Sequence, residues 1–336
     1  MKKIIWMAVS VIILATGCER YIDLETEGPE SLLVLNGNLC SGDTLHTVYL
    51  SLSQVRNIEP VTSAVLKCYV NGQMVSMTDE VTEYGISGMM HFKADFKPGD
   101  EVKITVESGE YKAETVSTVP SVPVISVTDT SYVQKDGKSN LKVHLKLKDV
   151  KSENNYYRLL AYKEHVDQVE KVNPESSYAL DYEVGEIVYS TSTSTYIDNS
   201  QESLLYRKMG ADEEQDRYDY YSNYYNIFTD SQFADGEYTL TLLVEGVYDG
   251  DSGSDMPSDG DLVISENRWL RFRILSLSNQ TYYYMNDYAF DHSDQSTWTF
   301  ISAIPYPSNV TGGTGMVSVM APADVAIKYD KRWNIY

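Results

Sequence analysis

Hydrophobic and polar residues alternate in short segments along residues 32–119. In 48–52 and again in 101–107, apolar side chains occupy every second position, which is the period of a half-buried β-strand. The dipeptide Asn71-Gly72 separates two such segments and predicts a tight hairpin, because both central residues of a type I′ turn need a positive φ. About seven short strands in this region predict an immunoglobulin-like β-sandwich.

A proline-containing joint, VPSVP at 119–123, follows this sandwich, and proline cannot donate a hydrogen bond to a central strand. Residues 141–148 then form the clearest strand of the chain, in which leucine or valine alternates with lysine or histidine. Further strands are expected at 156–162, 238–244 and 269–274. These segments predict a larger β-rich domain over 124–336.

One segment has a helical period instead. Apolar or aromatic residues recur at i, i+3 and i+7 between Tyr282 and Ala289, behind two candidate N-cap residues, Ser276 and Ser278. We therefore expect a helix over 279–291. The predicted fold class is mostly β, with an N-terminal immunoglobulin-like β-sandwich followed by a larger β-rich domain that carries one helix.

The first residues of the chain form a separate pattern. Lys2 and Lys3 precede an apolar run at 4–14, and small residues at 15–17 stand directly before Cys18. The run is too short for a membrane-spanning helix, which needs about 20 residues, so the pattern predicts a signal peptide over 1–17. A cysteine directly after such a cleavage site is typical of bacterial lipoproteins, and we expect Cys18 to be lipidated. The alternative is an ordinary secretory signal that ends near a cysteine.

The negative charge of the chain limits the kinds of molecule that it can bind. Residues 18–31 are acidic and predict a solvated tether between the anchor and the first domain. The formal net charge of the whole chain is −22, and it becomes −24 when Lys2 and Lys3 leave with the signal peptide. Such a surface repels nucleic acid and anionic lipid, so we expect no nucleic-acid partner. Attachment to a membrane would then depend on the acyl chains alone.

Cys40 and Cys68 remain once Cys18 is assigned to the lipid. Export to an oxidising compartment allows a disulfide between them. The alternative is that both are small buried core residues, a common role of free cysteine.

Other candidate chemistry is weak. The acidic loop 249–261 contains five aspartates that could hold Ca²⁺, but Gly260 stands where an EF-hand has its closing Glu, and a solvated loop is the alternative. The five histidines lack a metal-binding spacing. The segment 85–88, GISG, is one residue short of a nucleophile elbow. We therefore predict no metal site, no cofactor and no enzymatic activity.

Tyrosines are unusually concentrated in one acidic stretch, at Tyr218, Tyr220, Tyr221, Tyr224 and Tyr225. Tyrosine combines apolar area with a hydroxyl at low entropic cost, which suits ligand recognition. These five residues are the candidate ligand-binding set, although tyrosine is also common on half-buried strands. For the second group, at 282–284, we expect a structural role on the helix.

Several motifs occur in an order that resembles a known family. They are Cys18 with its acidic tether, LLVLNGNL, TVPSVPVISV, NNYYRLLAY, IFTDSQFADGEYTL, SLSNQTYYYMNDY and PYPSNVTGGTGMVSV. The chain is similar to Bacteroidota lipoproteins grouped as domain of unknown function 4249, from residue 18 to about residue 320. Members of this family resemble companions of outer-membrane TonB-dependent transporters, and acidic residues after the lipidated cysteine resemble a signal for display on the cell exterior. The resemblance implies no catalytic residues.

These observations lead to two functional hypotheses. The first is a lipid-anchored outer-membrane protein, facing the cell exterior, that captures a nutrient ligand or hands it on beside a TonB-dependent transporter. The alternative is a structural or adhesive cell-surface module without a transport role, which tandem β-domains on a lipid tether fit equally well.

Overall fold

The computed structural model describes most of the chain between residues 31 and 329. The described residues are 31–53, 58–135, 137–149, 154–170, 186–199, 201–205, 207–208, 220–221, 223, 225–245, 262–291 and 306–329. Their secondary structure is mostly β, as predicted, and α2 (Asn279–Asp291) is the one α-helix among them. None of the helices in these stretches has the length and apolar character needed to cross a membrane.

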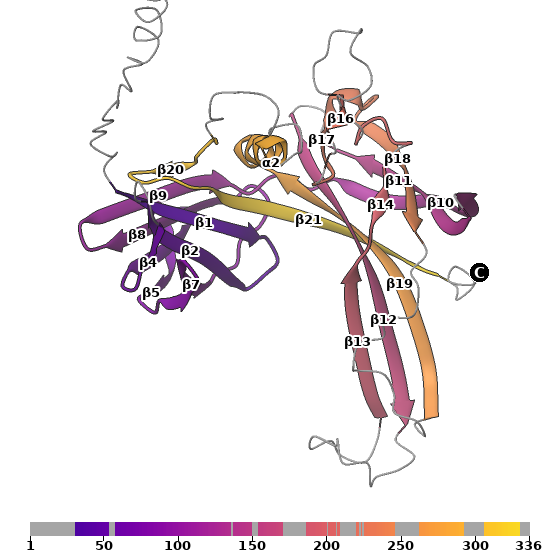
Figure 1. The fold of residues 1–336 in the computed structure, drawn as a ribbon, viewed down its shortest axis with the longest axis horizontal. Helices are drawn as coiled ribbons and strands as arrows, with labels where there is room; N and C mark the ends of the chain where they lie inside the picture. The colour runs from indigo at the N-terminus through magenta and orange to yellow at the C-terminus, as the bar shows by residue number, and fades with distance from the viewer. Residues whose placement is uncertain are drawn as a thin grey trace, which may run out of the picture.

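The N-terminal region forms two facing sheets (Figure 1). In the first sheet the order is β1 (Leu32–Cys40), β2 (Leu45–Ser53), β7 (Ser87–Lys93) and β6 (Thr82–Tyr84), with β3 (Ile58–Pro60) also paired to β2. In the second sheet the order is β9 (Tyr111–Thr118), β8 (Glu101–Ser108), β4 (Val65–Val70) and β5 (Gln73–Thr78). In chain order these are the A-B-E-D and G-F-C-C′ sheets of the immunoglobulin fold, which confirms the predicted sandwich.

Alternating side chains from both sheets fill the first core. Leu33 and Leu35 of β1 and Leu66 of β4 are fully buried, and so are their counterparts on the other strands. The predicted hairpin joins β4 and β5, where Asn71 has φ 49° and Gly72 has φ 77°, as a type I′ turn requires. Period-two patterning and turn chemistry therefore account for this domain.

The C-terminal region forms a second sandwich. One sheet has the order β10 (Val124–Lys135), β11 (Lys138–Lys148), β18 (Glu237–Glu245) and β14 (Ile197–Asp198). The facing sheet has the order β13 (Glu186–Ser194), β12 (Tyr156–Glu170), β19 (Leu262–Leu277) and β21 (Val317–Lys328), with β17 (Ile227–Thr229) also paired to β12. The predicted strand 141–148 forms the last eight residues of β11, and its apolar side chains are all buried in the second core.

Smaller elements and one extension complete this region. A short pair, β15 (Arg207–Lys208) with β16 (Tyr220–Tyr221), and the 3-10 turn η1 (Asp230–Gln232) lie between β14 and β18 in the chain. The backbones of β12, β13 and β19 stay paired as far as Glu170, Glu186 and Leu262. These three strands form an arm that projects from the second sandwich (Figure 1).

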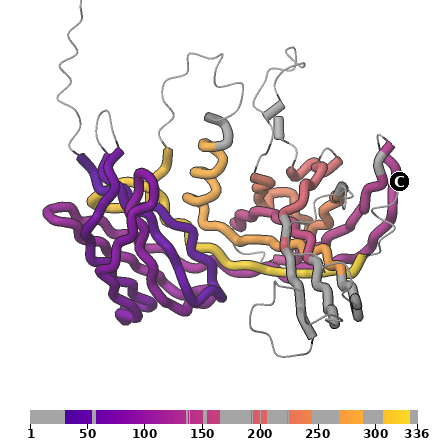
Figure 2. Tube along the Cα trace, turned by 60° about the horizontal axis from the view of Figure 1, so that its bottom comes forward, coloured from indigo at the N-terminus to yellow at the C-terminus, as the bar shows by residue number. Residues whose placement is uncertain are grey.

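The last strand belongs to both sandwiches, which the predicted division at 119–124 did not foresee. Residues 317–320 of β21 pair in parallel with β1, and residues 321–328 pair antiparallel with β19. The short strand β20 (Val310–Thr311) pairs with β9. Figure 2 shows the yellow C-terminal trace running from the first sandwich to the second. Val310, Val317, Val319 and Ala321 lie in the first core, so the region 310–321 was wrongly assigned to the C-terminal domain.

The reason for this placement is the open edge of the first sandwich. Strands β1 (A) and β9 (G) would otherwise expose unpaired N–H and C=O groups. β21 pairs with β1, and β20 pairs with β9, so these groups are hydrogen-bonded. The segment that connects β20 to β21 passes so close to β1 that it requires glycine. A Cβ at Gly313 would lie 2.3 Å from the carbonyl oxygen of Leu33. On either side of this contact, the amide of Thr314 donates to the Leu33 oxygen at 2.9 Å and the amide of Leu35 donates to the Thr314 oxygen at 2.8 Å.

We predict that Gly313→Ala lowers the free energy of unfolding by about 2–3 kcal/mol, because a backbone oxygen held in a strand ladder cannot move away from the new methyl group. Gly109→Ala is the control, since Gly109 has φ 58° but open space around it, and it should cost only about 1 kcal/mol. Urea unfolding measures both. A Gly313→Ala protein as stable as the wild type would contradict the close crossing.

Candidate ligand-binding site

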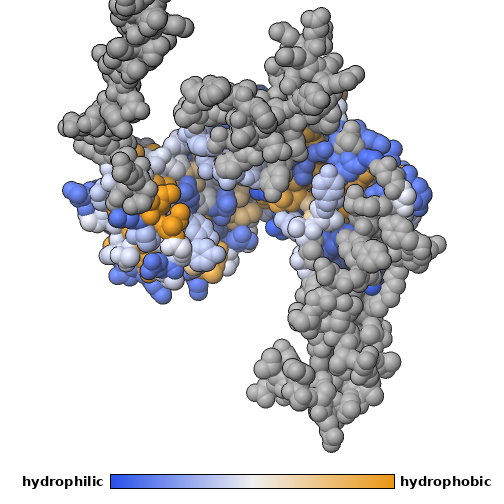
Figure 3. All heavy atoms as spheres, viewed as in Figure 1, coloured by the Kyte–Doolittle hydropathy of each residue, from blue (hydrophilic) through white to orange (hydrophobic). Residues whose placement is uncertain are grey.

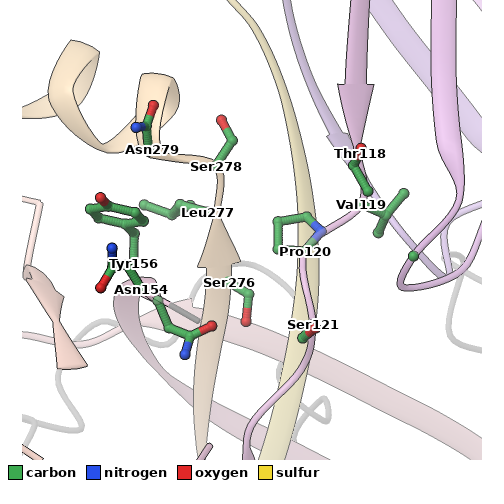
Figure 4. Close-up of a pocket in the computed structure, with 12 residues that line it drawn as sticks. Thr118, Val119, Pro120, Ser121, Asn154, Tyr156, Ser276, Leu277, Ser278 and Asn279 are labelled. Carbon is green, nitrogen blue, oxygen red and sulfur yellow. The ribbon is translucent and has the colours of Figure 1, made fainter. Parts of the chain in front are cut away.

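A pocket of about 320 Å³ lies where the two sandwiches meet the start of α2 (Figure 4). Its wall comes from the turn before β8, the joint after β9, the start of β12 and the end of β19. The lining residues are Gly99, Thr118, Val119, Pro120, Ser121, Asn154, Asn155, Tyr156, Ser276, Leu277, Ser278 and Asn279. None of these side chains carries a charge, although the chain as a whole is strongly acidic. The pocket therefore offers hydroxyl and amide groups to a polar ligand.

The start of α2 forms one side of the pocket. The Oγ of Ser278 accepts a hydrogen bond from the amide of Thr281 at 3.2 Å, and its carbonyl oxygen accepts one from the amide of Tyr282 at 3.0 Å. Ser278 is therefore the N-cap, and the predicted helix 279–291 is confirmed. Because the first amides of a helix have no intrahelical acceptor, this end of α2 presents donors toward the pocket.

Ser276 has a different role from the one that its position before the helix suggested. It is 2% exposed, and its Oγ has no hydrogen-bond partner. Figure 4 shows its side chain on the side of β19 that faces Pro120 and Ser121. On the other wall, Asn155 is held in place by Asp230, whose Oδ2 accepts from both the backbone amide and the Nδ2 of Asn155 at 3.0 Å. The pocket thus combines a fixed amide with an unsatisfied hydroxyl.

Next to the pocket lies a tyrosine cluster around α2, which we define as Tyr156, Tyr225, Tyr282, Tyr283, Tyr284, Tyr288 and Tyr306. The ring centroids are 5.0 Å apart for Tyr156 and Tyr282 and 5.7 Å apart for Tyr284 and Tyr306. Tyr282 is 4% exposed, as expected for a structural residue, whereas Tyr283 is 49% exposed. Burial raises the pKa of the Tyr156 and Tyr284 hydroxyls, so both are firmly protonated at neutral pH.

The five predicted ligand-binding tyrosines have different outcomes. Tyr225 joins the tyrosine cluster, with its ring centroid 6.3 Å from that of Tyr288. Tyr220 and Tyr221 form β16, of which only the backbone is described, and Tyr218 and Tyr224 lie outside the described residues. The structure therefore brings one member of the set to the site.

Asn223 positions this tyrosine and was not among the residues predicted from the sequence. Its side chain is buried, where Nδ2 donates to the carbonyl oxygens of Leu205 and Ile227 at 3.0 and 2.7 Å. Its Oδ1 accepts from the amide of Ile227 at 3.0 Å. These bonds fix the turn that carries Tyr225. The only sequence signal was an amide inside a tyrosine-rich stretch, and its acceptor on Leu205 is distant in the chain.

Cys40 and Cys68 are both free, so of the two alternatives for this pair the structure does not support the disulfide. Cys68 points into the first core between the two sheets, whereas Cys40 packs against the separate cluster of apolar residues beneath α2. Two side chains on different faces of the fold cannot reach each other without moving the backbone. Burial raises the pKa of both thiols to about 11, and nearby Asp43 adds to the effect at Cys40.

We predict that neither thiol reacts rapidly in the folded protein. With pKa values near 11, the thiolate fraction at pH 8 is far below that of an ordinary cysteine, and thiolate is the reactive form. A mature chain with Cys18→Ser should show two slow thiols toward Ellman's reagent and two fast ones in urea. A rapid native reaction, or no thiol after unfolding, would contradict the observed placement.

The remaining candidate residues lie elsewhere. Cys18 and the acidic loop 249–261 fall outside the described residues. Within the residues that the structure does describe, no group of three or more histidine, cysteine, aspartate or glutamate side chains is arranged to hold a metal ion.

Comparison with known proteins places the chain in a family. The family described as "Domain of unknown function (DUF4249)" matches residues 19–324. The chain belongs to this family. No curated protein matches this DUF4249 chain.

Among solved structures, the adhesin InvE of Yersinia pseudotuberculosis is similar to the DUF4249 chain at 18% identity, with a TM-score of 0.19. The match covers 72% of this chain and 54% of the adhesin, so the chain spans about half of the adhesin's length. A TM-score this low carries no argument about fold or function.

We predict that Ser278→Ala and Ser276→Ala differ in their effect on stability, although both serines line the pocket. Loss of the N-cap at Ser278 should cost about 1 kcal/mol, because the amide of Thr281 loses its acceptor. Ser276→Ala should stay within about 0.5 kcal/mol of the wild type, because its Oγ makes no bond to lose. Thermal unfolding of the two variants measures this. Equal losses would contradict the assignment of Ser278 as the cap.

Proposed function

We propose that this DUF4249 chain is a lipid-anchored outer-membrane protein of the Bacteroidota type that captures a ligand at the cell exterior and hands it to a TonB-dependent transporter. The signal pattern ending at Cys18 and the acidic tether support the anchor and its outward orientation. The resemblance of the motifs to companions of such transporters supports the partnership.

The observation that carries the ligand-capture proposal is the uncharged pocket between the sandwiches, adjoined by the tyrosine cluster. Pockets between domains are common ligand sites, and a volume of about 320 Å³ suits a small molecule. Its polar lining consists of serine, threonine, asparagine and tyrosine, without a carboxylate or histidine to act as a general base. This lining favours binding over catalysis, and the proposal includes no enzymatic step.

Exposed apolar surface on the first sandwich supports contact with a partner protein. Leu32 of β1, Tyr49 of β2 and Ile58 of β3 are 41%, 38% and 52% exposed. Figure 3 shows orange, apolar surface on this sandwich where β1 and β2 run. Contiguous apolar surface often marks an interaction site. Because β1 begins 14 residues after Cys18, a membrane-embedded partner is within reach of this face.

The projecting arm favours the alternative, a structural or adhesive module. The strands β12, β13 and β19 remain paired well beyond the residues that fill the second core. An extended arm adds reach to a surface protein without contributing to the pocket. It supports contact with other cells, matrix or glycans, and the experiment below separates the two functions.

We predict that the tagged lipoprotein, isolated from detergent-solubilised outer membranes, carries a stoichiometric TonB-dependent transporter detectable by mass spectrometry. The control is Cys18→Ala, which cannot be lipidated. Isolation of this variant from the membrane fraction should yield no transporter. Recovery of the lipoprotein alone, together with protease-accessible display on intact cells and unchanged nutrient uptake after its deletion, would reject the transport role and leave the adhesive one.

A further inference from the structure

Arg158 is a half-buried cation that forms no ion pair with a carboxylate of the described residues. It lies on β12, two residues beyond Tyr156, on the face of the sheet that α2 covers. Its Nε is sealed from solvent and has no hydrogen-bond partner. Among the described residues no carboxylate or carbonyl oxygen bonds its terminal nitrogens, which are not sealed in this way. The contact that the guanidinium does make is with the ring of Tyr225, whose centroid is 5.2 Å from Cζ.

The two other arginines on the same face each form an ion pair with a carboxylate. Arg271 makes a two-pronged ion pair with Glu164, at 2.6 and 2.9 Å, and Arg273 makes one with Asp324, at 2.8 and 2.9 Å. These pairs show that the sheet supplies carboxylates at the neighbouring positions. Arg158 pairs across the strands with Leu275 on one side and Ile227 on the other, and neither side chain carries an acceptor. On the described part of this face, Arg158 is therefore the guanidinium without an acceptor.

A partly buried guanidinium without an acceptor costs free energy unless another group binds to it. Burial of an unpaired charge is unfavourable, and buried arginines are normally bonded to carboxylate or phosphate. Burial lowers the pKa of Arg158, and no carboxylate of the described residues opposes this effect. An arginine side chain nevertheless remains charged at neutral pH. The cation–π contact with Tyr225 compensates only in part, since a ring face accepts no directed hydrogen bond from the guanidinium fork.

We propose that Arg158 binds an oxyanion of the captured ligand, a carboxylate or a phosphate group, with the Tyr225 ring beside it. The guanidinium fork presents paired donors that match the two oxygens of either group. Tyr162 lies near the same guanidinium, and Tyr288 lies beside Tyr225, so aromatic surface is available to the body of an organic anion. Arg158 and Tyr225 are not lining residues of the pocket, so the oxyanion would be held outside it, on the tyrosine-cluster side of Tyr156. This inference rests on the proposed ligand capture and names the chemical class of the ligand.

Because the protein as a whole is acidic, an anionic ligand needs a local cation in order to bind. A chain with a net charge of −22 repels anions over most of its surface. An anionic ligand would thus need a specific, partly desolvated cation, where electrostatic attraction is stronger than at an exposed site. Arg158 is such a cation, and its terminal nitrogens are left for the ligand.

The test is calorimetric titration of the purified mature chain, carrying Cys18→Ser, with benzoate, with inorganic phosphate and with benzyl alcohol as the uncharged analogue of benzoate. We expect one-to-one binding of benzoate or phosphate and none of benzyl alcohol. A preference for benzoate identifies a carboxylate ligand, and a preference for phosphate identifies a phosphorylated one. Arg158→Met should weaken the binding at least tenfold.

Two further variants serve as controls for the effect of Arg158→Met. Arg271→Met removes a matched arginine from the same face and should bind the anions as the wild type does. Arg158→Lys keeps the charge without the fork and should bind more weakly than the wild type, which tests the site even if Arg158→Met folds poorly. Absence of anion binding by the wild type, or equal binding by the wild type and the Arg158 variants, would overturn the inference.

The outcome is separable from that of the membrane isolation. Anion binding without a co-isolated transporter would leave the Arg158 site standing and reject the transport role. A co-isolated transporter without anion binding would reject only the Arg158 site.

Discussion

The backbone ladder of β21 is the interaction on which the rest of the structure depends. Its first residues complete the edge of the first sandwich beside β1, and its last residues complete the sheet of the second sandwich beside β19. A single strand thus joins one sheet of each β-sandwich into a continuous sheet of ten strands. The edge groups of β1 and β9 find partners in the same chain, which removes a surface that would otherwise invite pairing with other molecules.

The candidate site is a consequence of this connection. Because β19 is held against β21, its end at Leu277 and the N-cap Ser278 lie opposite the joint that leaves β9. The pocket is therefore formed by segments from both sandwiches, and α2 seals the outer face of β12 and β19 with an apolar cluster of its own. Where that cluster ends, Arg158 and Tyr225 meet, so the binding surface begins at the boundary of a small core.

Much of the fold was predictable from local patterns. The alternation in 141–148 predicted a strand with one buried face, Asn71-Gly72 predicted the turn between β4 and β5, and the spacing from Tyr282 to Ala289 predicted α2. The site was much less predictable. Tyr225 was selected among five tyrosines for its residue type, but its contact with Arg158 joins positions that are far apart in sequence and carry no common motif.

The sequence by itself determined the elements, because hydrophobic period, turn residues and caps act over a few neighbouring positions. It also determined the strongly acidic charge and the expected lipidation at Cys18. Only the tertiary structure decided that 310–321 belongs to the first sandwich and that Cys40 and Cys68 face different cores. It also decided that Arg158 finds no acceptor among the described residues. Strand pairing and burial join residues across the whole chain, and no local pattern records which distant strand satisfies an open edge or which cation is left without a carboxylate.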